Sequence, residues 1–162
     1  MKLLHYSAEP FRFDPNREYP VDHWKPHGLW LSVEGELDWP AWCERESFDL
    51  DRMKCVVEIN LKPVANVLLI DTPEKLDVFN ARFGVDDNSV HSIAWEKVKA
   101  LYDGVIIAPY HWERRLNLMW YYGWDCASGV IWNLSAIANV TLPSNDKLTG
   151  CRGYWQSGVA SC

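Results

Sequence analysis

The side chains best suited to chemistry near the N-terminus are a histidine, a tryptophan and two serines. His5 and Ser7 lie in "LLHYS", and Trp30 and Ser32 lie in "KPHGLWLS". Residues two apart in a strand share a face, so each pair presents its side chains to one side. An imidazole nitrogen orients a ligand hydroxyl, and an indole stacks on a planar ring. The pairs predict a ligand site, and the alternative is that His5 and Trp30 belong to the core.

Gly28 begins the second of these segments. A glycine at the start of a strand permits the close approach of another backbone or of a ligand. The sequence alone leaves both explanations open.

A second group of chemically useful residues lies late in the chain, in "WYYGWDCASGVIWN" (120–133). Its rings surround Asp125, the only carboxylate of the segment. A carboxylate in such a place stabilises a developing positive charge or acts as a base, and the alternative is that Asp125 caps a turn. Ser128 and two glycines in the same segment let the chain and a ligand approach closely.

Composition narrows the class of protein. The chain has 162 residues, which fits one domain, and a net charge of −6. This acidity argues against broad non-specific binding to nucleic acid or to an anionic membrane, and no apolar run is long enough to predict a transmembrane helix. Ten tryptophans in so short a chain fit both a core built from large rings and a stacking site for a planar ligand.

The cysteines and histidines do not predict a metal site. The five cysteines form no CxxC pair, and an odd number without a signal peptide predicts reduced thiols and a cytoplasmic protein. A zinc site needs ordered spacings, and His5, His23, His27, Cys43 and Cys55 are too scattered to provide them.

The order of elements predicts a single α+β domain over residues 1–162. A long loop is expected over 8–27. The core is expected over about 3–137, and 139–162 as an accessory strand or a flexible tail. Helices are expected from Asp38 to about Phe48 and over 72–84 and 92–104. Strands are expected over 3–7, 28–33, 55–61, 64–71, 104–110 and 129–137.

These pieces, in this order, resemble the ADP-ribosyltransferase superfamily. The resemblance rests on the histidine of "LLHYS", the Gly-Leu-Trp-x-Ser segment, "YDGV" and "SGVIWNLSAI", which is similar to the family's "EYVVFDPSQI". It implies a fold with a pair of small β-sheets and helices. The "KPxGLWxS" segment also resembles compact proteins of phages and bacteria.

The resemblance implies roles for individual residues. His5 matches the histidine that holds the nicotinamide-side ribose of NAD, Ser7 matches a small polar residue that follows it, and Trp30 stands where a stacking tyrosine usually lies. Ser128 falls at the position of the family's glutamate. Asp125, three residues earlier, is the acid that would replace that glutamate.

The function implied by the resemblance is binding of NAD as a substrate and transfer of ADP-ribose to a protein or nucleic-acid acceptor. The expected site consists of His5, Ser7, Gly28, Trp30 and Ser32 for binding, with Asp125 and Ser128 for chemistry. A second class stays open, because the same tryptophans would serve a non-catalytic module for a nucleotide, a nucleotide-derived signal or a protein surface. Sugar binding through tryptophan faces is a third. No membrane partner is expected, and the oligomeric state is left open.

Overall fold

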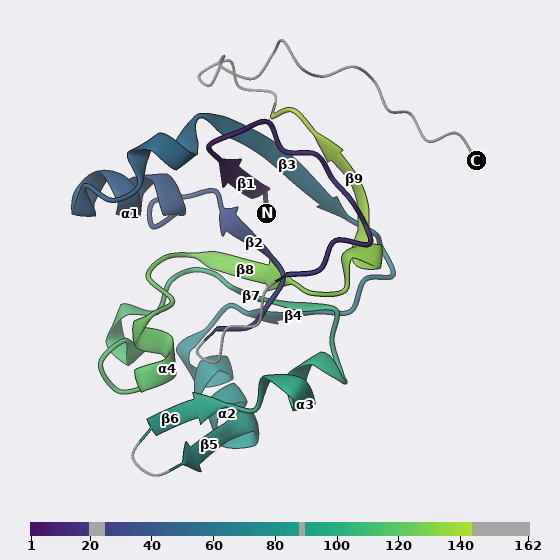
Figure 1. The fold of residues 1–162 in the computed structure, drawn as a ribbon. Coiled ribbons are helices and arrows are strands. Elements are labelled where there is room, and N and C mark those ends of the chain that lie inside the picture. The colour runs from purple at the N-terminus through teal and green to yellow at the C-terminus, as the bar shows by residue number, and fades with distance from the viewer. Residues whose placement is uncertain (20–24, 88–89, 144–162) are drawn as a thin grey trace.

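A curled seven-stranded sheet forms the centre of the structure, a computed structural model that describes residues 1–19, 25–87 and 90–143 (Figure 1). Neighbouring strands are antiparallel, except for β4 and β7, which are parallel. Across the sheet, the strands are β4 (Val67–Ile70), β7 (Gly104–Ile107), β8 (Ser128–Ile131), β2 (Leu29–Val33), β1 (Leu3–Ser7), β3 (Cys55–Leu61) and β9 (Ile137–Thr141).

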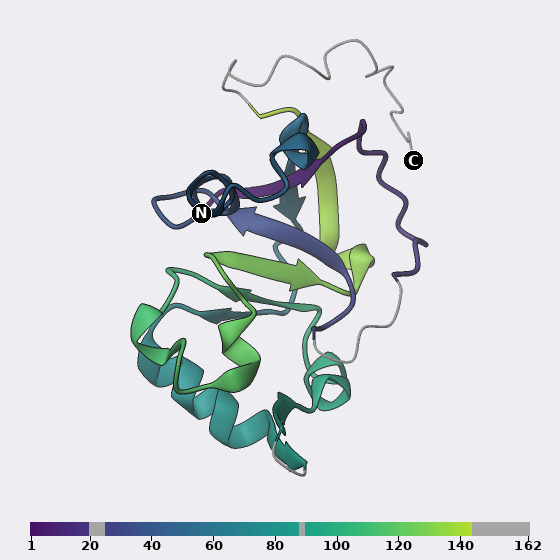
Figure 2. The same cartoon turned by 60° about the vertical axis from the view of Figure 1, so that its left-hand side comes forward.

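Short helices and one hairpin complete the α+β domain. Figures 1 and 2 show α2, α3 and α4 near the β4–β7 end, whereas α1 lies beside the N-terminus. β5 (Gly84–Asp87) and β6 (Val90–Ile93) pair as a separate hairpin. The α-helices are α1 (Trp39–Glu46), α2 (Pro73–Phe83), α3 (Trp95–Lys99) and α4 (Met119–Tyr122), and 3₁₀ turns occupy Leu50–Met53, Trp112–Arg114 and Leu134–Ala136.

The two longest α-helices of the described chain, α1 and α2, begin where capping chemistry predicts. The Asp38 carboxylate accepts a hydrogen bond from the Ala41 amide at 3.0 Å, with a proline in the first turn of α1. The Thr72 hydroxyl accepts from the Lys75 amide at 3.3 Å at the start of α2. Such caps satisfy amides that have no partner inside the helix. Both predicted helix starts are confirmed.

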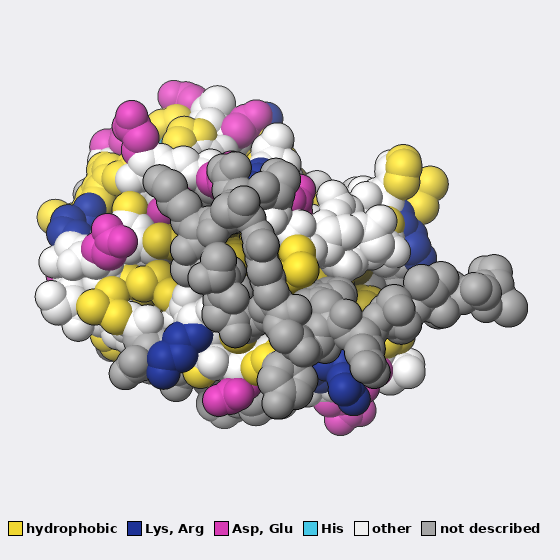
Figure 3. Space-filling view, turned by 90° about the horizontal axis from the view of Figure 1, so that it is seen from above, with side chains coloured by type: hydrophobic (Ala, Val, Ile, Leu, Met, Phe, Trp, Pro, Cys, Tyr) yellow, Lys and Arg dark blue, Asp and Glu magenta, His cyan; other side chains and the backbone are white. Residues whose placement is uncertain are grey.

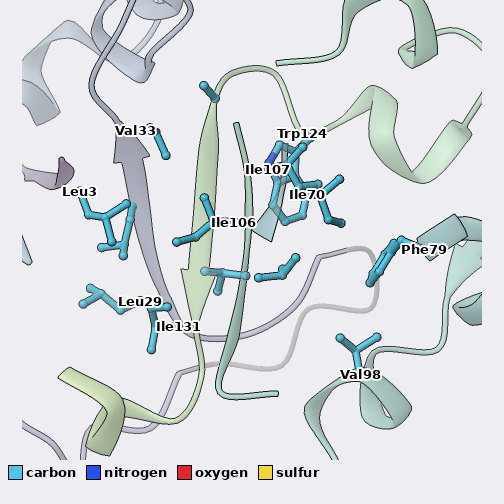
Figure 4. Packing of buried hydrophobic residues seen from close by; sticks show 14 of the residues in the cluster. Leu3, Leu29, Val33, Ile70, Phe79, Val98, Ile106, Ile107, Trp124 and Ile131 are labelled. Carbon is cyan, nitrogen blue, oxygen red and sulfur yellow. The ribbon is translucent and has the colours of Figure 1, made fainter. Parts of the chain in front are cut away.

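The core packs against both faces of the sheet. Strand register puts Leu29 opposite Ile131 on one face, while Ile107 and Ile70 pair on the other. Figure 4 shows Leu29 and Ile131 in one group and Ile70 in another, on the side of the helices. Because β7 and β8 are buried on both faces, they read in the sequence as continuous apolar runs without alternation.

Two expectations about the elements are corrected. The helix expected over 92–104 is only α3, because the residues just before it pair as β6 in the hairpin, a non-local partnership that periodicity does not reveal. At the start of the segment expected as an accessory strand or a flexible tail, β9 pairs with β3 at the sheet edge, which is the first of these alternatives. The expected pair of small sheets is one continuous seven-stranded sheet beside the hairpin. Residues 144–162 lie outside the described chain.

The cysteines differ from one another. Cys43 and Cys126 are free and buried, but Cys55 is disulfide-bonded, so the expectation of reduced thiols is wrong at this residue.

Among the described residues, no helix has both the length and the apolar character needed to cross a membrane. On the described part of the face in Figure 3, acidic and basic side chains are interspersed among hydrophobic ones.

Candidate functional site

The site lies where β1 and β2 move apart. These strands pair only at Leu3–Val33 and Leu4–Ser32, whereas β1 continues to pair with β3 through Ser7. β2 likewise continues to pair with β8. Beyond Ser32, the His5 side chain spans the gap, with Nδ1 2.9 Å from the Trp30 carbonyl oxygen.

A pocket of about 330 Å³ opens at this gap. Five of the residues predicted from the sequence line it: His5, Trp30, Ser32, Asp125 and Ser128. They come from β1, β2, β8 and the loop before β8, so residues separated by more than a hundred positions meet around one space. The volume lies at the lower end of the range for small-molecule sites, about 300–1,000 Å³.

The hydrogen bond to Trp30 defines the state of the His5 ring. A carbonyl oxygen only accepts, so Nδ1 carries the proton and Nε2 is left as an acceptor. Burial lowers the pKa of His5, and the backbone hydrogen bond to Trp30 opposes this in part. The ring also packs against Phe11, with centroids 4.5 Å apart. His5 is therefore both the backbone-bonded histidine of the alternative explanation and a pocket residue.

Ser7 and Gly28 are not among the residues that line the pocket. The Ser7 hydroxyl donates to the Glu9 carbonyl at 2.7 Å and stabilises the turn after β1. Gly28 has φ of +153°, and a Cβ there would lie 2.5 Å from the Ile131 carbonyl oxygen. Of the two explanations for this glycine, close approach of another backbone is the one that the structure supports.

Three tryptophans form the aromatic wall: Trp30, Trp39 and Trp124. The rings of Trp30 and Trp124 lie 4.9 Å apart at an interplanar angle of 57°. Trp124 is 3% exposed, and its Nε1 has no hydrogen-bond partner among the described residues. A buried donor without a partner is costly, and this N–H is closed off from solvent.

Asp125 lies between two cations. Its Oδ2 is 3.8 Å from Lys25 Nζ, and its Oδ1 is 3.7 Å from Arg115 Nη2. The backbone of Asp125 is left-handed, with φ of 68°, a conformation that Asp and Asn tolerate better than most residues. The sequence did not predict either partner, because Lys25 lies in the long N-terminal loop and Arg115 directly follows the 3₁₀ turn Trp112–Arg114, and no periodicity links either residue to Asp125.

The two serines face each other across the β2–β8 ladder, since Ser32 pairs with Ser128. The Ser32 hydroxyl accepts from the Trp39 amide at 2.9 Å. The Ser128 hydroxyl donates to the Cys126 carbonyl at 3.0 Å. Ser128 therefore supplies a polar wall and not a charge, and Asp49 and Asp125 are the carboxylates among the described residues that line the pocket.

Sequence reasoning missed several pocket residues. Lys25 and Trp39 line the pocket, although the sequence placed Lys25 only in the loop over 8–27 and Trp39 only in the helix that begins at Asp38. Tyr6 lines it too, and burial, with a smaller contribution from Asp38, raises its pKa to about 12. Burial also raises the pKa of Cys126 to about 12, so this thiol is a poor nucleophile at neutral pH. The one available signal for Lys25 was its place in "KPH", directly before Gly-Leu-Trp.

No group of three or more metal-binding side chains occurs within residues 1–19, 25–87 and 90–143. His23, one of the scattered histidines, lies outside these ranges.

Comparison with known proteins found no matching family model, no matching curated protein and no matching solved structure. The fold and the pocket define an α+β domain with a tryptophan-lined pocket at the junction of β1 and β2.

Proposed function

We propose that the pocket binds the nicotinamide–ribose end of NAD and that the chain is an ADP-ribosyltransferase-like enzyme acting on a macromolecular acceptor. The observation that carries the proposal is the meeting of His5, Trp30 and Asp125 around one pocket. The pocket is small for a whole dinucleotide, so the adenosine part would extend beyond it.

Recognition would use a ring and an acceptor. The nicotinamide ring of NAD is flat and cationic, and a cation over a tryptophan face is favourable. Lys25 already lies there, with Nζ 5.5 Å from the centre of the Trp30 ring, so this face accepts a positive charge. The Nε2 acceptor of His5 suits a ribose hydroxyl, which donates.

Transfer would break the bond between the nicotinamide nitrogen and ribose C1′. The electron pair leaves with nicotinamide, which becomes neutral, and positive charge develops on the ribose. The Asp125 carboxylate would stabilise that charge. An acceptor nucleophile then forms the new bond to C1′ and loses its proton to solvent or to a carboxylate.

A non-catalytic binding module is the second candidate, and the side chain at position 128 and the ion pairs of Asp125 favour it. Ser128 has a hydroxyl where the resemblance places a glutamate, and Asp125 shares its charge with Lys25 and Arg115. A carboxylate paired with two cations has less charge to offer a developing cation. In this case the same rings would hold NAD or a related nucleotide without turnover.

One experiment separates the two candidates. The protein is incubated with radiolabelled NAD and a cell lysate, and tryptophan quenching by NAD is measured in parallel. The Asp125→Asn variant keeps the shape and the left-handed backbone but removes the charge. The matched control is Asp77→Asn, which alters an exposed ion pair with Arg114.

Transferred label that disappears in Asp125→Asn and persists in Asp77→Asn supports the enzyme. Quenching without transferred label supports the binding module. Absence of quenching in the wild-type protein refutes NAD binding, and with it both forms of the proposal that involve NAD.

A further inference from the structure

The pocket has an exposure gradient from a deep end to a mouth. Trp124, Ser32 and Ser128 are 3–5% exposed, whereas the Lys25 side chain is 41% exposed. A ligand that seats its flat ring at the deep end would therefore pass Lys25 on its way to solvent. Lys25 is also the only Lys or Arg among the described residues that line the pocket.

The position of Lys25 is set by loose contacts. Its Cε lies 3.5 Å from the place that a Cβ on Gly123 would occupy, so the aliphatic stem runs along the backbone of that glycine. The ammonium lies 3.8 Å from Asp125 and 5.5 Å from the Trp30 ring centre. Neither contact is a short charge-assisted hydrogen bond, which spans about 2.7–2.9 Å.

Arg115 is the second cation beside Asp125, at a similar distance of 3.7 Å, and two rings hold it in place. Its side chain is 20% exposed, and its guanidinium packs over the rings of Trp112 and Tyr122 at 5.2 and 4.9 Å. If Lys25 moves away, Asp125 keeps this cation and is not left unpaired. Lys25 is thus free to exchange partners without the cost of an isolated carboxylate.

We propose that Lys25 is the residue that recognises the phosphate of the ligand at the pocket mouth and gives the site its preference for phosphorylated nicotinamide compounds. The inference rests on the proposed NAD binding. When a flat ring stacks on Trp30, the ammonium leaves that face and pairs with a phosphate oxygen. An anion entering a pocket that already holds the Asp125 carboxylate needs such a cation, because like charges repel at short range.

Four ligands test the assignment by tryptophan quenching. Nicotinamide and nicotinamide riboside have no phosphate, nicotinamide mononucleotide has one, and NAD has two. The variants are Lys25→Gln, which keeps the stem, and Lys25→Arg, which keeps the charge. Lys62→Gln, on exposed chain after β3, is the matched control for the loss of one positive charge.

In Lys25→Gln, we expect NAD and the mononucleotide to bind about tenfold more weakly. This is the lower end of the range for loss of a charge-assisted hydrogen bond, because the site is partly exposed. The affinity for nicotinamide riboside should stay within about twofold, Lys25→Arg should restore binding, and the tenfold difference should shrink at high salt.

Equal weakening for nicotinamide riboside would overturn the assignment, because Lys25 would then act on the ring or the ribose. Unchanged NAD affinity in Lys25→Gln would overturn it while leaving NAD binding intact. If no ligand quenches the wild-type protein, the proposed function itself fails.

Discussion

The hydrogen bond from His5 to the Trp30 carbonyl, called the bridge below, makes the sharpest prediction, because it separates a structural role of the imidazole from a ligand-binding role. His5→Ala removes both nitrogens. His5→Asn keeps an N–H donor near the position of Nδ1 and loses the acceptor at Nε2 together with the ring. The two variants should therefore differ in stability but not in ligand binding.

The structure supplies the magnitude. Removal of the donor in the 2.9 Å hydrogen bond leaves the Trp30 carbonyl without its partner, which costs about 1–2 kcal/mol. Loss of the ring contact with Phe11 at 4.5 Å adds about 0.5–1 kcal/mol. His5→Ala should lower the free energy of unfolding by about 1.5–3 kcal/mol, and His5→Asn by about half of that.

Urea unfolding followed by tryptophan fluorescence measures the stability term, and NAD quenching measures the binding term. Both variants should lose most of the NAD affinity, since neither retains Nε2. If His5→Asn is as unstable as His5→Ala, the bridge is not what connects β1 to β2. If His5→Asn binds NAD as well as the wild type does, the imidazole has no part in recognition.

Three further predictions follow. Gly28→Ala should lower the free energy of unfolding by about 2 kcal/mol or more through overpacking, because its Cβ would lie 2.5 Å from the Ile131 carbonyl oxygen. The control is Gly35→Ala, whose Cβ would have nothing within 4 Å. Equal effects of the two substitutions would contradict the close approach. Burial lowers the pKa of His5, so the unfolded chain binds the proton more readily, and stability should fall as pH drops below about 6.5; urea unfolding at pH 7.5 and 5.5 measures this, and a fall just as large in His5→Asn would assign it to other groups. NADH, whose nicotinamide ring is uncharged, should bind about threefold or more weakly than NAD if Trp30 attracts the ring as a cation; equal quenching curves would refute that attraction.

The N-terminal part of the site could be read from the sequence because its signal is local. Alternation along "LLHYS" and "GLWLS" predicted two strands, and both form. The register of β1 with β2 puts Leu4 opposite Ser32, so His5 belongs to the face opposite Trp30 and reaches it through the Trp30 backbone carbonyl and not ring to ring. What the pattern did not contain was the early end of that pairing at Ser32, which depends on how β1 and β2 each follow another neighbour.

The rest of the site depends on contacts between distant segments. Asp125 was recognisable as a lone carboxylate among rings, but its neighbours Lys25 and Arg115 come from separate loops that no periodicity links. Gly28 was recognisable as a place of close approach, and only packing could decide between a backbone and a ligand. The helix expected over 92–104 failed for the same reason, because β6 gains its partner from β5.

Backbone pairing is thin where β1 meets β2, so this is the place where the sheet separates most readily into β1, β3 and β9 on one side and β2, β8, β7 and β4 on the other. A molecule seated across the gap would touch His5 on one part and Trp30 on the other, and its binding free energy would add to the cohesion of the whole sheet. Amide hydrogen exchange would then slow in β3 and β8 alike, although the bound molecule would reach few of their residues.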